Sequence, residues 1–189
     1  MKRKSKIIVS ILAALILIIS GIFVYLKLNP LSAKTEAVEV WSFLSDDPAL
    51  SSWFDEARNG SSEYQVFIDM NNLPSEHTED YVQIIYYFSV KSHLFDSANT
   101  IRPIVSNISD NSDAFIFSPK LFPVQVDAFG NGKCQLNVIM YRGNLTDEQL
   151  EEKIRNVTAE LLYETSGDSG QVEISGIESA PITYRQFDW

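Results

Sequence analysis

The chain has 189 residues, of which 45% are apolar and 21% charged, a composition typical of a folded globular protein that excludes a disordered one. Ten of its 15 Lys and Arg residues lie from Leu31 onward, together with all 25 Asp and Glu residues, which gives this part a net charge of −15. Such acidity excludes nucleic-acid binding and disfavours docking on an anionic lipid surface.

An apolar segment at Ile7–Leu26 contains no charged residue. A helix of that length extends about 30 Å, the thickness of the hydrocarbon core of a bilayer. Four basic residues precede the segment and only Lys27 follows it, so residues 1–6 are expected to be a cytoplasmic basic tail. The sequence therefore predicts a single-pass signal-anchor helix in a cell membrane, with the C-terminal domain extracytoplasmic.

A cleaved signal peptide is the alternative interpretation of the same segment. The apolar run in this chain is longer than the core of a typical signal peptide, which has about 7–15 residues. The best cleavage position follows Ala33, but bulky Leu31 stands where a small side chain is preferred. Residues 27–35, with Pro30 after the helix, are expected to form a linker to a β-rich domain at residues 36–189.

The first part of that domain combines strand and helix signals. A strand is expected at Val38–Phe43, and a short helix near 48–58 follows, because Asp47 can cap it and Pro48 suits its first position. Alternation of apolar residues predicts strands at Tyr64–Met70 and Tyr81–Val90. The second has apolar residues on both faces, so we expect both to be covered.

The middle of the chain is predicted to be entirely β. Two weaker strand signals come first, and two runs flanking Gly130-Asn131-Gly132 then predict a hairpin. The expected strands are Ile101–Ile108, Phe115–Phe117, Phe122–Phe129 and Lys133–Arg142.

A helix is predicted next, at Asp147–Glu164. Thr146 and Gln149 match a capping box, and four apolar residues then recur at helical spacing: Leu150, Ile154, Val157 and Leu161. Strands are expected again at Val172–Ile177 and Thr183–Phe187. The terminal residues Tyr184–Trp189 are interpreted as a last paired strand, with a partner-binding tail as the alternative.

Seven to nine strands and two helices predict a mostly β domain, an antiparallel β-sandwich. In outline this resembles immunoglobulin-like domains, although the Cys–Trp–Cys pattern of true members is absent. The alternative is an α+β fold with the amphipathic helix packed on one sheet.

No catalytic, cofactor-binding or metal-binding residues are predicted, and no cofactor is expected. His77 lies among Glu76, Glu79 and Asp80, but one imidazole in a polar loop is a poor zinc site. The run Asp110–Asp113 resembles a calcium-loop fragment that lacks the acidic ligand at the twelfth position. His93 near Asp96 could form a dyad only with a partner that the sequence does not identify.

Two further residue types have a structural and a functional interpretation. Cys134 lies in a strand-like run and is expected to be a buried small hydrophobe rather than a nucleophile. The tryptophans at positions 41, 53 and 189 could form a sugar-stacking platform, but core packing is the favoured interpretation.

These observations favour a non-enzymatic function. A single cysteine permits no intrachain disulfide, which fits a bacterial exported domain. We therefore expect a binding or assembly module of a bacterial cell envelope, held in the membrane by Ile7–Leu26 and contacting another envelope protein or a wall component. The alternatives are an envelope hydrolase using carboxylates that the sequence does not identify, and a secreted protein released by cleavage near Ala33.

Overall fold

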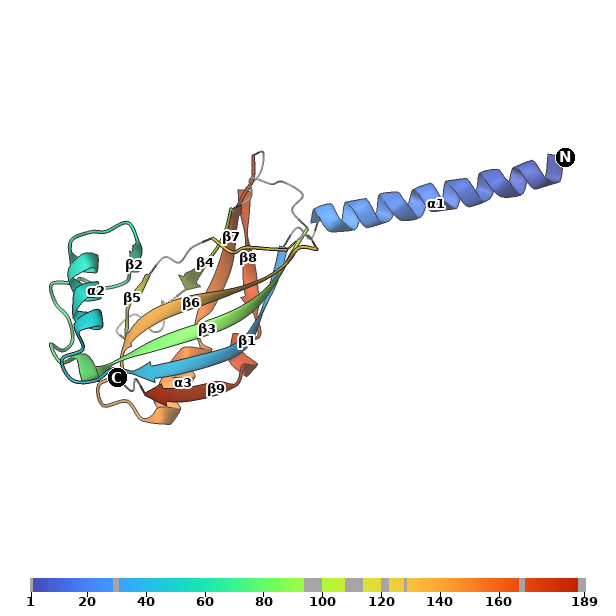
Figure 1. Ribbon diagram of the computed structural model, residues 1–189. Helices are drawn as coiled ribbons and strands as arrows, with labels where there is room; N and C mark the ends of the chain where they lie inside the picture. The colour runs from blue at the N-terminus through green and yellow to red at the C-terminus, as the bar shows by residue number, and fades with distance from the viewer. Residues whose placement is uncertain are drawn as a thin grey trace.

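The computed structural model describes residues 2–28, 31–93, 100–107, 114–119, 123–127, 129–166 and 169–186, with the side chains of the first helix described from Ser10 to Tyr25. This part of the chain contains three α-helices, two short 3-10 helices and nine strands (Figure 1). In chain order they are α1 (Lys2–Leu28), β1 (Leu31–Ser42), α2 (Pro48–Arg58), β2 (Tyr64–Val66), η1 (Thr78–Asp80), β3 (Tyr81–Ser92), β4 (Thr100–Asn107), β5 (Phe115–Pro119), β6 (Asn131–Tyr141), α3 (Asp147–Arg155), β7 (Thr158–Glu164), β8 (Ser169–Ser175), η2 (Ile177–Ser179) and β9 (Ile182–Gln186).

The strands form one mixed sheet that curls on itself, in the order β2-β5-β6-β3-β1-β8-β7-β4, with β9 beside β1. β3 lies between β1 and β6 and is antiparallel to both. β1 joins the two halves of the curl, because it pairs with β3 along one side and its first residues pair with β8 along the other. Its later residues pair with β9 on the same side as β8. The pairs with β8 and β9 are both parallel.

The mostly β class is confirmed, but the predicted antiparallel sandwich is not observed as such. After β8 the chain turns through Gly176, whose φ is 83°, and through η2, and then continues as β9 along the same side of β1. The curl is therefore one continuous sheet instead of two separate ones. Alternation of apolar residues indicates which face of a strand is buried, but it does not indicate the direction of the neighbouring strand.

Two hydrophobic cores stabilise the two faces of β3. The larger lies inside the curl, where Tyr86 and Phe88 of β3 pack with residues of β4, β7 and α3. The smaller lies under α2 on the opposite face, where Phe54 packs edge-on against Tyr81 with ring centroids 5.0 Å apart. The prediction of α2 is confirmed, including its cap: Asp47 Oδ1 accepts hydrogen bonds from the N–H groups of Ala49 and Leu50.

The amphipathic helix is shorter than predicted. The capping box of Thr146 and Gln149 is present, but α3 ends at Arg155, and residues predicted to be helical form β7. Within β7 the buried residues alternate, with Ala159 and Leu161 facing the core. Leu161 would be buried whether this segment formed a helix or a strand. Hydrogen bonding to β4 and β8 favours the strand.

Three other boundaries differ from the predictions. β1 begins at Leu31, so residues 31–35 belong to a strand and not to the expected linker. β2 ends at Val66, well short of Met70. The predicted hairpin is reduced to a single bridge between Val126 and Gly132, because β6 pairs instead with β3 and β5.

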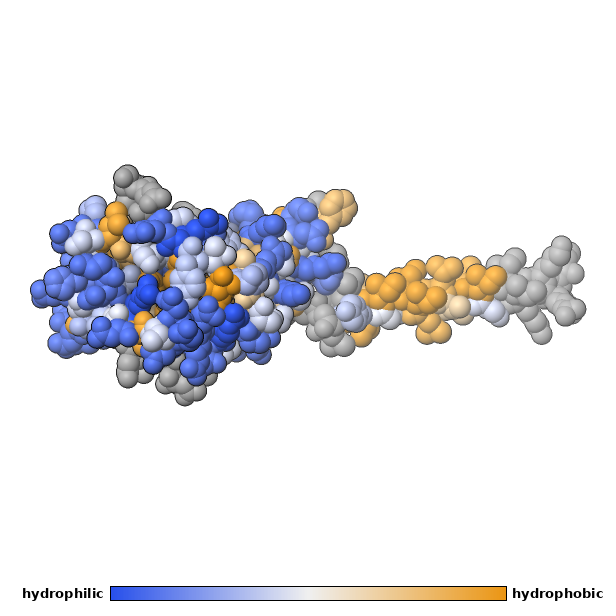
Figure 2. Space-filling view, turned by 90° about the horizontal axis from the view of Figure 1, so that it is seen from below, coloured by the Kyte–Doolittle hydropathy of each residue, from blue (hydrophilic) through white to orange (hydrophobic). Residues whose placement is uncertain are grey.

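α1 extends away from the sheet as a straight rod (Figure 1). Figure 2 shows its described surface as almost continuously apolar beside a mostly polar domain. Each large apolar side chain described on it, from Ile11 to Tyr25, is 53–73% exposed. The transmembrane assignment of Ile7–Leu26 is not supported, because no helix within the described residues has both the length and the apolarity required for a membrane span.

Candidate functional site

One face of the sheet, formed by β9, β1, β3 and β6, is only partly covered, and we call it the outer face. Along β3, the outward side chains change from buried at Tyr81 and Gln83, through half-buried at Ile85 and Tyr87, to exposed at Lys91. α2 covers the first of these positions only. The expectation that both faces of this strand are covered is therefore wrong beyond its first third.

A polar network centred on Glu39 occupies the middle of the outer face. Its carboxylate accepts hydrogen bonds from the indole N–H of Trp41 at 3.1 Å, from the hydroxyl of Tyr87 at 3.1 Å and from Arg185 at 3.2 Å. Burial acts to raise the pKa of Glu39, but the hydrogen bonds from Trp41, Tyr87 and Arg185 and the positive charge of Arg185 outweigh it and hold the pKa below its ordinary value. The network thus links three strands and keeps an ionised carboxylate on this face.

Asn137 of β6 lies on the same face, opposite Ile85. The side chain is 9% exposed, and its Oδ1 accepts no hydrogen bond from any described residue. A buried acceptor without a partner is uncommon because it loses its hydrogen bonds to water without replacing them. The atom itself is buried, so the loss of its hydrogen bonds to water is a cost to the stability of the sheet.

β9 forms one margin of the outer face. Among the described residues it pairs with β1 alone, and four of its five residues are exposed. An edge strand of this kind presents backbone N–H and C=O groups that can pair with a further strand. The prediction of a last paired strand at Tyr184–Trp189 is confirmed for residues 184–186, which belong to β9, and residues 187–189 lie outside the described part of the chain.

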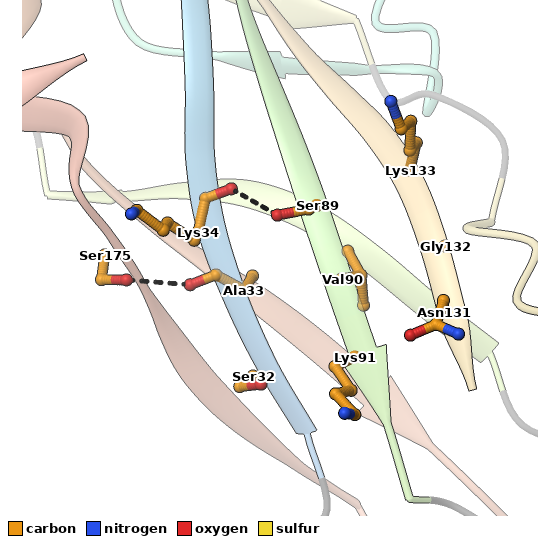
Figure 3. A pocket seen from close by; sticks show the side chains of 10 residues that line it. All are labelled: Ser32, Ala33, Lys34, Ser89, Val90, Lys91, Asn131, Gly132, Lys133 and Ser175. Carbon is orange, nitrogen blue, oxygen red and sulfur yellow. Dashed lines mark hydrogen bonds between the residues drawn. The ribbon is translucent and has the colours of Figure 1, made fainter. Parts of the chain in front are cut away.

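The ends of β1, β3 and β6 next to α1 form what we call the proximal end (Figure 1). An open hollow of about 770 Å³ lies there, and its lining includes Lys34, Lys91 and Lys133, one from each strand (Figure 3). A second hollow of about 410 Å³, also lined by Lys133, adjoins Tyr87. The outer face therefore continues into a lysine-bearing surface close to α1.

The acidic loop around His77 forms structural hydrogen bonds. The hydroxyl of Ser45 donates to Glu79 at 3.2 Å, and the hydroxyl of Ser75 donates to Asp80 at 2.5 Å. These carboxylates help to hold the loop that precedes β3. Within the described ranges, no group of three or more His, Cys, Asp or Glu side chains could hold a metal ion.

Cys134 faces the larger core from β6 and is half-buried rather than fully buried. Burial raises the pKa of its thiol to about 12. A thiol with this pKa is almost entirely protonated at neutral pH. Because the thiolate is the nucleophilic form, Cys134 is a poor nucleophile.

The tryptophans do not form a platform in the described structure. Trp41 belongs to the Glu39 network, whereas Trp53 packs edge-on against Phe43 beside the smaller core, with ring centroids 6.3 Å apart. Trp189, Asp96 and the run Asp110–Asp113 lie outside the described residues. Neither the Glu39 network nor the proximal lysines could be recognised in the sequence, because their members are brought together by strand register.

Comparisons with protein-family models, with curated proteins and with solved structures find no match for this chain.

Proposed function

We propose that this protein is a membrane-anchored binding or assembly module of a bacterial cell envelope, with its β domain on the extracytoplasmic side. The observation that carries the proposal is the partly covered outer face, bordered by the edge of β9. Such surfaces serve recognition, because they offer apolar area, hydrogen-bonding groups and an unpaired strand edge together.

The anchor is supported by the uncharged segment Ile7–Leu26 and by the basic residues before it. The large apolar side chains described on α1 are all more than half exposed, an arrangement that is costly in water and favourable in lipid. Only residues 29 and 30 separate α1 from β1, so an anchored domain stays close to the membrane surface.

The binding role is supported by the chemistry of the outer face. Trp41 and Tyr87 are partly exposed aromatic residues, and aromatic residues are enriched at protein interfaces. Arg185 and Glu39 add a charged pair. A protein or a wall component that covers this face would bury the aromatic rings and contact the charged pair.

Release by cleavage after Ala33 is less favourable as an alternative. Leu31 and Ala33 are both buried, and Ala33 is paired with Val90 on one side and with Ile174 on the other. The carbonyl of Ala33 also accepts a hydrogen bond from the Ser175 hydroxyl at 3.1 Å. A chain beginning at Lys34 would lose these contacts from the first strand of its sheet.

Membrane fractionation with protease treatment tests the anchor. The full chain should remain with bacterial membranes after alkaline carbonate washing, and protease added to spheroplasts should digest the domain. Recovery of the chain in the soluble fraction, or a domain protected from external protease, would contradict the proposed topology.

Site-specific photo-crosslinking tests the outer face. A benzoylphenylalanine replaces Tyr87 in the full chain in cells, and the same replacement at Tyr64 is the control. Both tyrosines are half-buried and donate their hydroxyl to a glutamate, Glu39 and Glu56 respectively. Tyr64 differs in position, because it lies on β2 and packs against Phe117 of the smaller core. A discrete adduct is expected from position 87 only, and equal adducts from both positions, or none from position 87, would refute the binding role.

A further inference from the structure

The proximal end carries a group of basic residues, although the domain as a whole has a net negative charge. Three of the ten basic residues found from Leu31 onward, Lys34, Lys91 and Lys133, lie there on one face of the sheet. Strand register explains the grouping, because Ser89 of β3 pairs with Lys34 on one side and with Lys133 on the other. Lys91 lies two residues farther along β3 and points to the same side.

These lysines are largely available to a ligand. Lys34 and Lys91 make no ion pair with any residue that the structure describes, and Lys133 contacts Glu36 at 3.7 Å. The side chains of that pair are 83% and 47% exposed, so the pair contributes little to stability. Lys133 can therefore leave Glu36 for a ligand at low cost. Ser32, Ser89 and Asn131 lie between the lysines and add hydrogen-bonding groups (Figure 3).

An exposed aromatic residue lies at the same end. Phe129 is 83% exposed, whereas every other exposed large apolar side chain described outside α1 is 40% exposed or less. It lies in the tight turn before β6, whose Gly130 accepts a hydrogen bond from the N–H of Ser92 at the end of β3. Ser92 pairs with Leu31, the first residue of β1, so this turn is adjacent to the point where α1 leads into the sheet.

The turn that presents Phe129 is held firmly. The carboxylate of Asp127 accepts hydrogen bonds from the N–H groups of Phe129 and Asn131, each at 2.8 Å. Gly130 has a φ of 78°, and a Cβ atom at this position would overlap the carbonyl oxygen of Ser92. These hydrogen bonds help to hold the backbone of Phe129, whose exposed side chain would lose unfavourable contact with water if it were buried.

The proximal end is the part of the sheet nearest α1 (Figure 1). Lys34 lies three residues into β1, about 10 Å along the strand from its start. The polar headgroup region is roughly 5–8 Å thick on each side of the hydrocarbon core. With α1 in the membrane, the lysine side chains and Phe129 lie within reach of the headgroups, and aromatic residues together with lysines are typical of such interfaces.

We propose that the proximal end docks on an anionic phospholipid surface, with Phe129 inserted at the headgroup level and Lys34, Lys91 and Lys133 bound to lipid phosphates. This inference rests on the membrane anchoring proposed above. The net charge of the domain disfavours such docking, but salt screens charges that lie more than about 8 Å away, so the charges nearest the bilayer dominate.

The test uses the full chain in vesicles, with an environment-sensitive fluorophore on a cysteine at Phe129→Cys in a Cys134→Ala background. The control is Val66→Cys in the same background, since Val66 is 40% exposed and lies on β2. In vesicles of phosphatidylglycerol and phosphatidylcholine, lipid-borne spin labels should quench the fluorophore at position 129 and not at position 66. Each lysine near an anionic surface strengthens association about fivefold, so Lys91→Gln with Lys133→Gln should weaken docking roughly 25-fold.

Separate arms distinguish the causes of failure. Flotation of the vesicles reports the anchor: a chain that does not float overturns both proposals, and a floating chain whose position 129 is no more quenched than position 66 overturns docking alone. Quenching at position 129 that is equally strong in vesicles of pure phosphatidylcholine also overturns lipid docking. So does a fluorescence change at position 129 that only soluble poly(glycerol phosphate) produces. Hydrogen exchange at residues 129–133 of the unsubstituted chain should slow with phosphatidylglycerol, and unchanged exchange counts against the proposal even if the labelled variants fold poorly.

Discussion

At the scale of single residues, the carboxylate of Glu39 is the most connected group on the outer face. Its three donors come from β1, β3 and β9, so the network reinforces the register of these strands. The acidity of the carboxylate and the stability of the sheet are therefore coupled.

Glu39→Gln should lower the free energy of unfolding at pH 7 by about 1 kcal/mol, because hydrogen bonds to a charged acceptor are stronger than those to a neutral one. The folded-state pKa of Glu39 is lowered, so its contribution is present above the unfolded value of about 4.3 and is lost as pH falls through the folded value. Urea unfolding between pH 7 and pH 3 should show a shallower loss of stability in the variant. Identical slopes for both proteins would contradict this assignment.

Asn137→Leu should leave stability unchanged or raise it by about 1 kcal/mol, since removing a buried acceptor without a partner removes a desolvation cost. The hydrogen bond from the Ser118 hydroxyl is made to the backbone carbonyl of Asn137 and is retained. Thermal and urea unfolding measure the effect, with Gln135→Leu on the same face as the control. A loss above about 2 kcal/mol would mean that the amide has a stabilising partner.

At the scale of elements, β1 shows what sequence patterns can and cannot predict. The capping signals at Asp47 and Thr146 predicted where α2 and α3 begin, because a cap is a local interaction. The start of β1 could not be predicted in the same way, since residues 31–35 resemble a linker until they pair with β3 and β8. The same limit explains the overlong helix, because only long-range pairing makes β7 a strand.

Leu31→Ala should destabilise the full chain by about 2 kcal/mol, because a buried leucine at the end of a strand loses packing and leaves a partial cavity. Ser32→Ala is the matched control, since Ser32 is exposed on the opposite face of the same strand. Urea unfolding compares the two variants. Equal stabilities would indicate that Leu31 belongs to a linker after all.

At the scale of the whole molecule, the positions of the charged residues indicate possible binding surfaces better than the net charge does. The net charge of −15 from Leu31 onward correctly describes the domain but hides a lysine cluster at one end. The outer face was equally hidden, because the apolar residues on both sides of β3 predicted full coverage, whereas α2 covers only one end. Both features arise from register across strands that are distant in the sequence.

Hydrogen exchange across the domain should follow the sheet order. The amides of β3 should exchange most slowly, because this strand is paired on both sides and contributes to both cores. Those of β2, β4 and β9 should exchange faster, since each has one neighbouring strand within the described sheet. Mass spectrometry of the exchanging full chain can rank these segments, and faster exchange in β3 than in β9 would be inconsistent with this architecture.

The parallel pairing of β1 with β9 has a mechanical consequence. β1 starts beside α1, and β9 ends near Ser42 at the opposite end of the sheet. A force applied between α1 and the last strand therefore pulls along the strands and loads the hydrogen bonds of β1 in shear, all at once, instead of opening them one by one. The sheet is therefore arranged to resist tension between α1 and β9, which under the proposed function are the tether and an edge that a partner can reach.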